Sequence, residues 1–140
     1  MRLADVLPRL KSVDWGSLGV CHAVIYGSLA KRGEGRDVDI LIVWCSGEGD
    51  LVSVAVQVAD AVGADPSEVD VVDLERAPCP IVQDALGGVV AHTVDRSALI
   101  DAIVRKAEIC WDWEITMKKL RIIETAVNSA KRRWGSWGSS

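Results

Sequence analysis

Residues 26–44 read YGSLAKRGEGRDVDILIVW, and they contain the strongest secondary-structure signals of the chain. Its second half, residues 37–44, begins with alternating polar and apolar residues and then becomes apolar on both faces, as a central strand does. Just upstream, residues 20–26 are rich in β-branched residues and end at Gly27, which predicts a buried strand followed by a turn. The glycines of residues 28–36 predict a loop after one helical turn.

The rest of the chain continues the alternation of helices and strands. Apolar spacing predicts a short helix within residues 4–13, limited by Pro8. From Asp95 onward, where no Gly or Pro occurs before Gly135, it predicts one long helix or two joined helices, with Asp95 or Ser97 as the N-cap. Between them the pattern predicts a helix at 50–62, a strand at 69–74, a helix at 80–86 and a strand at 89–94. This order predicts an α/β (α+β) domain with one mixed four-stranded sheet flanked by helices, and it leaves the strand order open.

The 140 residues suit a single domain, for which we expect a core at residues 1–95, a helical extension at 96–134 that packs on the core or on a partner, and a flexible tail at 135–140. No apolar run approaches the roughly 20 residues of a membrane span, and the N-terminal residues lack the apolar core of a secretory signal. We therefore expect a cytoplasmic protein with no membrane partner.

The net charge of −4 argues against direct binding to nucleic acid through phosphate attraction. The C-terminal region differs, because residues 118–133 contain six basic side chains and one acid. A solvated helix face is the expected reason for that local charge.

The four cysteines, Cys21, Cys45, Cys79 and Cys110, show no CxxC pair and none of the spacings typical of zinc sites or disulfide frameworks. Free cysteine behaves as a small hydrophobe and is commonly buried. We therefore expect four buried free thiols.

Two carboxylates at the start of the second strand are the first candidates for chemistry. Asp37 and Asp39 are two residues apart, so their side chains share a face of the strand with stems about 7 Å apart. Each negative charge disfavours ionisation of the other, and a divalent cation removes that cost. Hard oxygen ligands on a rigid strand suit Mg²⁺ together with nucleotide phosphates.

The Gly27-Ser28 turn predicts the complementary phosphate site. Glycine lets a phosphate approach main-chain N–H groups, a following helical turn presents its positive end, and the serine hydroxyl donates a further hydrogen bond. Lys31 and Arg32 are within a turn of Ser28 and are the candidate cations for a triphosphate, while Arg36 adjoins the first carboxylate.

A third carboxylate would complete a site in which two metal ions assist in-line displacement at phosphorus. The strand at 69–74 offers Asp70 and Asp73, which are three residues apart and so face opposite sides. Asp70 is preferred because it is near the start of the strand between valines, whereas Asp73, at the strand end, should reach solvent more easily.

These residues resemble the minimal nucleotidyltransferases of the DNA polymerase β superfamily. The resemblance covers residues 1–95 and rests on Gly27-Ser28, Asp37-Val38-Asp39 and the aspartate of VDVVDL. It implies the polymerase-β-like nucleotidyltransferase fold, phosphate contacts from Gly27 and Ser28, and Mg²⁺ ligation by the acidic triad Asp37, Asp39 and Asp70. The eight residues 29–36 between the two motifs are fewer than is usual in the family.

Small members of that family often act as antitoxins encoded beside a helical HEPN-domain ribonuclease toxin. The resemblance implies transfer of AMP from ATP to a hydroxyl, that of a tyrosine, on such a partner. Trp111 and Trp113 are two residues apart on the expected helix and cannot both point inward, so this helix is a candidate surface for the partner or for a second copy of the chain. The alternative is a non-catalytic nucleotide-binding or protein-interaction module that neutralises its partner by occlusion.

Overall fold

The computed structural model describes residues 1–112 and residue 118. Two compact units are distinguished, residues 1–107 and 108–140, and the fold below is that of the first unit. The elements follow the predicted order: α1 (Leu3–Leu10), β1 (Val20–Tyr26), α2 (Gly27–Arg32), β2 (Val38–Trp44), α3 (Leu51–Val62), the 3-10 helix η1 (Pro66–Glu68), β3 (Val69–Asp73), α4 (Cys79–Leu86) and β4 (Val89–Thr93). Residues 96–112 are helical as well.

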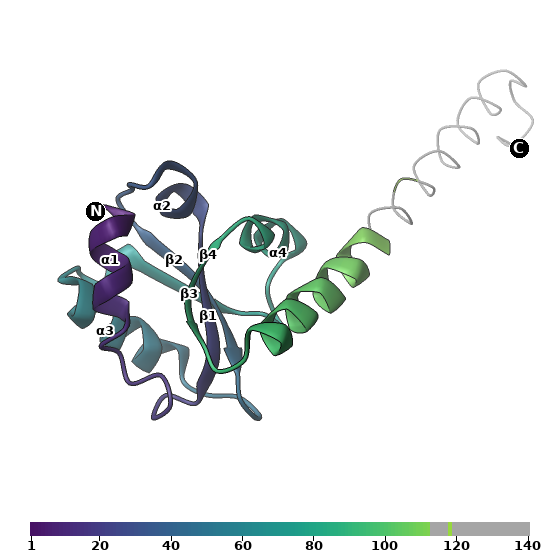
Figure 1. Ribbon diagram of the computed structural model, residues 1–140, viewed down its shortest axis with the longest axis horizontal. Coiled ribbons are helices and arrows are strands. Elements are labelled where there is room, and N and C mark those ends of the chain that lie inside the picture. The colour runs from purple at the N-terminus through teal and green to yellow at the C-terminus, as the bar shows by residue number, and fades with distance from the viewer. Residues whose placement is uncertain (113–117, 119–140) are drawn as a thin grey trace, which may run out of the picture. The chain divides into compact units, whose positions relative to one another are not determined.

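The four strands form one mixed sheet in the order β3-β2-β1-β4 (Figure 1). β1 pairs antiparallel with both β2 and β4, whereas β2 and β3 run parallel. The mixed four-stranded sheet predicted from the sequence is therefore confirmed. This order places β1 and β2, the two strands on either side of the quoted loop, at the centre of the sheet.

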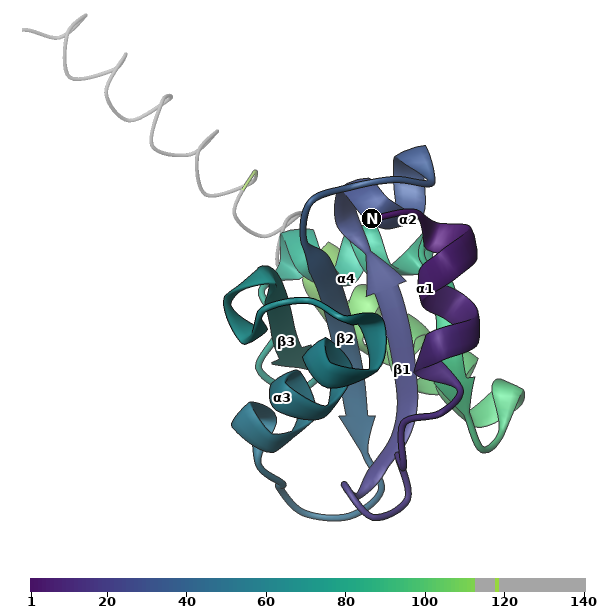
Figure 2. The same ribbon diagram turned by 90° about the vertical axis from the view of Figure 1, so that its left-hand side faces the viewer.

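Helices cover both faces of the sheet. α1 and α3 lie on one face, and α4 with the beginning of the helix at 96–112 lies on the other (Figures 1 and 2). Leu10 of α1, Val58 of α3 and Ile40 of β2 are fully buried in the core between α1, α3 and the sheet. Because strand side chains alternate, Asp39 and Leu41 point to the opposite face, toward α4.

Local capping fixes where two of the helices begin. The Asp50 carboxylate accepts a hydrogen bond from the backbone N–H of Val52 at 3.0 Å, and Gly63 ends α3 in the left-handed conformation. Asp95 accepts from the backbone N–H of Ser97 at 3.0 Å, so Asp95 is the N-cap of the helix at 96–112. The sequence had left the choice between Asp95 and Ser97 open.

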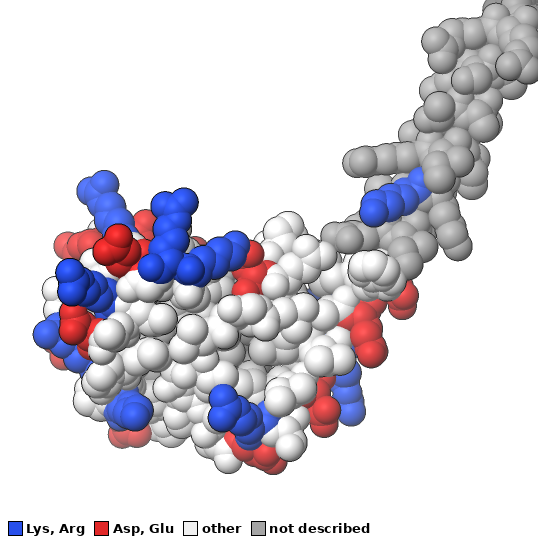
Figure 3. Space-filling model, turned by 45° about the horizontal axis from the view of Figure 1, so that its top comes forward, with Lys and Arg blue, Asp and Glu red and all other residues white. Residues whose placement is uncertain are grey.

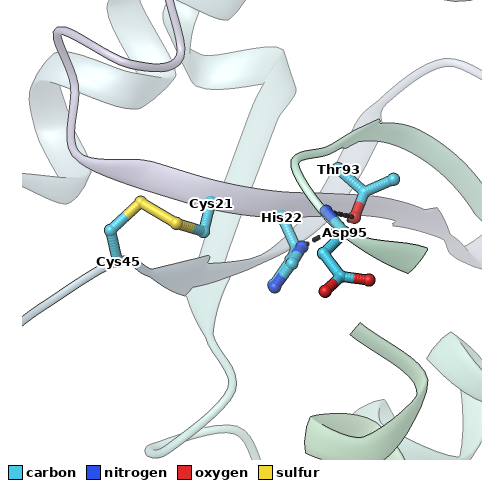
Figure 4. The surroundings of a disulfide bond; sticks show 5 residues. All are labelled: Cys21, His22, Cys45, Thr93 and Asp95. Carbon is cyan, nitrogen blue, oxygen red and sulfur yellow. Dashed lines mark hydrogen bonds between the residues drawn. A yellow bond between two sulfur atoms is a disulfide. The ribbon is translucent and has the colours of Figure 1, made fainter. Parts of the chain in front are cut away.

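The expectation of four free thiols was wrong. Cys21 of β1 and Cys45, which follows β2, form a disulfide with their Cα atoms 4.9 Å apart (Figure 4). The antiparallel pairing of β1 with β2 brings the two residues opposite each other although they are 24 apart in the sequence. The side chain of His22 points away from this bond, toward Thr93, whose hydroxyl is 2.8 Å from Nδ1 (Figure 4). The structure leaves no free cysteine among the described residues.

No helix within residues 1–112 and 118 has the length and apolar character needed to cross a membrane. Trp113 and the predicted tail at 135–140 lie outside the described residues.

Candidate active site

Two of the predicted carboxylates meet on neighbouring strands. In the parallel pairing of β2 with β3, Asp39 is directly opposite Asp70, so both side chains point to the same face of the sheet. Asp37 lies in the bend just before β2, two residues from Asp39, and its negative charge contributes to the raised pKa of Asp39. Asp39 is therefore close to both of the other predicted acids; Asp37 and Asp70 are exposed and Asp39 is half-buried.

Asp73 does not join this group. Strand alternation places it with Val69 and Val71, which contact the α1 and α3 core on the other face. The sequence argument that Asp73 would reach solvent more easily than Asp70 was wrong, because Asp73 is 4% exposed. Its carboxylate accepts a hydrogen bond from the backbone N–H of Arg76 at 2.9 Å and so helps the chain to turn after β3.

Gly27 connects β1 to α2 directly beside Asp39. Its φ of +76° is a conformation that residues with a Cβ rarely adopt. A Cβ at this position would lie 2.5 Å from Oδ2 of Asp39. Glycine therefore lets the Gly27-Ser28 turn approach the carboxylate closely, and the exposed Ser28 follows within the same turn.

We expect Gly27→Ala to displace Asp39 and to lower the rate of the reaction proposed below about a hundredfold. The added methyl group meets the carboxylate oxygen, and the left-handed conformation costs a further 1–2 kcal/mol or so of folding free energy. Steady-state kinetics and chemical denaturation measure the two effects. Gly47→Ala is the matched control, because Gly47 also has a positive φ of +63° but no atom lies within 4 Å of an added Cβ. Equal activity losses in the two variants would contradict this role for Gly27.

The site has an excess of negative charge. Burial, followed by the neighbouring charges of Asp70, Asp37 and Asp84, raises the pKa of Asp39 above its usual value. The pKa of the buried Tyr26, which is paired with Asp39 across β1 and β2, is also raised, first by burial and then by carboxylates that include Asp70. A cation between these groups would relieve the repulsion.

Asp84 of α4 is a fourth acid at this site that the sequence analysis missed. Its charge acts on both Asp39 and Tyr26, and its carboxylate forms an ion pair of 2.8 Å with Nζ of Lys31. Nothing in the sequence of α4 distinguishes Asp84 from a solvated helix residue. Only the packing of α4 against β1 brings it to the acidic face.

The predicted cations separate in the structure. The amine of Lys31 is bound to Asp84, which connects α2 to α4. Arg32, one residue later, instead lines a pocket together with Ser28 and Arg36.

Comparison with known proteins rests on structure alone, since no family model matches the chain and no curated protein matches its sequence. A chain of the complex between the tri-AMPylated HEPN toxin of Shewanella oneidensis and MNT antitoxin is similar with a TM-score of 0.61 and 16% identity, over 89% of this chain and 98% of that one. A chain of a toxin–antitoxin complex with AMP-PNP gives 0.59 and 17%, over 91% and 99%. A chain of a MntA–HepT toxin–antitoxin complex gives 0.57 and 16%, over 89% and 97%.

The chain shares its fold with these chains of toxin–antitoxin complexes. The similarity extends over nearly the whole of each chain, and the mixed sheet with helices on both faces agrees with it. Within this fold Asp39 and Asp70 lie at the starts of β2 and β3, and Gly27 lies directly beside Asp39.

The side chains of the site have the chemistry that a divalent cation requires. Carboxylate oxygens are the ligands that Mg²⁺ prefers, and the pKa of Asp39 is raised first by burial and then by the neighbouring carboxylates. As the side chains stand, no three His, Cys, Asp or Glu residues of the described chain enclose a metal position. The chemistry of the residues therefore fits Mg²⁺, and the exposed side chains of Asp37 and Asp70 have room to turn toward such an ion.

Proposed function

We propose that this protein is a Mg²⁺-dependent nucleotidyltransferase that moves AMP from ATP to a hydroxyl group, that of a tyrosine, on a HEPN-type toxin, and that it acts as the antitoxin of that pair. The observation that carries the proposal is the register of β2 and β3, which sets Asp39 opposite Asp70 beside the Gly27-Ser28 turn. The nucleotidyltransferase fold is consistent with this chemistry, and we expect the reaction in the cytoplasm.

Each residue of the site has a role in this proposal. Asp37, Asp39 and Asp70 would hold Mg²⁺, which when bound neutralises charge on the phosphates and on the leaving group. The backbone around Gly27 and the hydroxyl of Ser28 would bind phosphate oxygens, because the glycine leaves room for them. Arg32 would bind the outer phosphates, whereas Lys31, through its ion pair with Asp84, would position α2 and α4.

In the transfer step the oxygen of the acceptor hydroxyl forms a bond to the α-phosphorus of ATP, and the bond between that phosphorus and pyrophosphate breaks. The hydroxyl proton passes to a carboxylate. Asp70 is suited to accept it, since it is exposed at the edge of the acidic group and therefore open to an acceptor from another chain.

The partner is inferred from the similar structures, one of which is a tri-AMPylated HEPN toxin in complex with MNT antitoxin. The helix at 96–112 carries Trp111, whose side chain is 62% exposed. Large exposed aromatic residues are enriched in protein interfaces. We propose that the predicted extension, residues 96–134, contacts the toxin. The alternative partner for this extension is a second copy of the chain.

The test is incubation of the protein with Mg²⁺, α-labelled ATP and a HEPN-type toxin. We expect the label on the partner, with one pyrophosphate released for each AMP transferred and no transfer when EDTA removes the metal. Suppression of the toxin without any transfer of label would instead support the alternative of neutralisation by occlusion. In that case charged substitutions at Trp111 should abolish suppression and Asp39→Asn should not.

A further inference from the structure

A pocket of 520 Å³ opens beside Ser28, at the side of the site away from α4. Its lining comes from the N-terminal residues, from the start of α2 and from the loop that follows α2. The lining residues are Met1, Arg2, Ser28, Arg32, Glu34, Gly35 and Arg36.

The pocket exists because the N-terminal segment is hydrogen-bonded to the loop between the two sequence motifs. The backbone N–H of Leu3 donates to the carbonyl of Gly33 at 2.8 Å, and that of Gly35 donates to the carbonyl of Met1 at 2.9 Å. An isolated antiparallel bridge joins Arg2 to Glu34 between these two bonds. The main chain thus holds Arg2 next to Glu34, although the two residues are 32 apart in the sequence.

The pocket is positively charged. Its lining includes three arginines, Arg2, Arg32 and Arg36, and one acid, Glu34. All three arginines are exposed, and within residues 1–112 and 118 none of them forms an ion pair. Basic side chains gather over α2 and the N-terminus (Figure 3), although the chain as a whole has a net charge of −4. The planar guanidinium group of an unpaired arginine can donate two parallel hydrogen bonds to the oxygens of a phosphate.

We propose that Arg2 is a nucleotide-binding residue. Together with Arg32 and Arg36 it binds the β- and γ-phosphates of the nucleotide and, after transfer, the pyrophosphate product. The proposal rests on the proposed function, because the pocket meets the acidic site at Ser28. The short loop at residues 29–36 would then provide only part of the phosphate-binding pocket, and the N-terminal segment would provide the rest.

Titration calorimetry with a non-hydrolysable ATP analogue, inorganic pyrophosphate and AMP, each with Mg²⁺, tests this inference. Arg2→Gln should weaken binding of the analogue and of pyrophosphate about tenfold or more and leave AMP binding within about twofold, because charge-assisted hydrogen bonds to the outer phosphates are lost. Arg2→Lys keeps the charge but not the guanidinium fork, so its loss should be smaller. Arg105→Gln, an exposed arginine of the helix at 96–112, is the matched control and should bind all three as the parent does.

The outcomes separate the two proposals. If the parent protein binds neither the analogue nor AMP, the proposed function fails. If the parent binds the analogue and Arg2→Gln binds it equally well, the role of Arg2 is overturned while the proposed function stands. An equal loss of analogue and AMP binding in Arg2→Gln would also overturn it. Thermal unfolding of Arg2→Gln should match the parent, because the bridge to Glu34 uses only the backbone of Arg2.

Discussion

Asp39→Asn should reduce transfer of AMP to the partner about a thousandfold. Asp39 lies between Asp37 and Asp70 in the acidic group and is directly against Gly27, so its carboxylate is central to any metal held there. Loss of that ligand removes several kcal/mol of transition-state stabilisation, and each 1.36 kcal/mol is a factor of ten in rate. The measurement is the initial rate of label transfer at saturating Mg²⁺ and ATP.

The stability of the same variant provides the control for folding. The pKa of Asp39 is higher in the folded protein than its ordinary value of 3.8, so the folded protein loses stability as the pH rises through the folded pKa and Asp39 ionises. Asparagine does not ionise, so at pH 7 the free energy of unfolding of Asp39→Asn should be at least as large as that of the parent. Below pH 3.8, where Asp39 is protonated in both states, the variant should have no such advantage. Asp60→Asn, an exposed change in α3, should keep full activity. An active Asp39→Asn, or an inactive Asp60→Asn, would contradict the assignment of the site.

Replacement of both Cys21 and Cys45 by alanine should lower the free energy of unfolding by about 3.5 kcal/mol. The disulfide closes a loop between residues 24 apart. On the chain-entropy model, its loss raises the conformational entropy of the unfolded chain and so stabilises the unfolded state by that free energy. For a domain of this size the midpoint of thermal unfolding should fall by about 10 °C. Denaturation in guanidinium, with and without the substitutions, measures the change.

Activity is the control for this second prediction. Cys21 is at the start of β1 and Gly27 follows its end, roughly 20 Å along the strand, so transfer rates at low temperature should match those of the parent. Ser12→Ala, an exposed change after α1, should alter neither quantity by much. Equal stability of the double variant and the parent would show that the disulfide does not constrain the unfolded chain.

The fold was largely predictable because local patterns and tertiary structure agree in this chain. Alternating and continuous apolar runs gave β1 and β2 nearly to the residue, and apolar spacing gave α3. That Asp37 and Asp39 share a face stays a prediction, because Asp37 lies in the bend before β2 and outside the strand whose alternation the prediction used. Strand order could not be predicted, since nothing local determines which strands become neighbours.

The features that the sequence did not predict depend on contacts between distant segments. The disulfide needs β1 beside β2, and cysteine spacing does not report which strands become neighbours. Asp84 reaches the acidic face only through the packing of α4, and Arg2 reaches the pocket only through the bridge to Glu34. Asp70 lies opposite Asp39, and its role as the third carboxylate stays a prediction. The burial of Asp73 was misjudged because the α1 and α3 core extends to the end of β3.

The most direct test of the acidic group is anomalous diffraction from crystals grown with Mn²⁺ in place of Mg²⁺ and a non-hydrolysable ATP analogue. If Asp39 and Asp70 hold the metal, we expect a strong anomalous peak within coordination distance of carboxylate oxygens of both residues, next to the α-phosphate. A bound nucleotide with Mn²⁺ held elsewhere, or with no metal against either carboxylate, would contradict it.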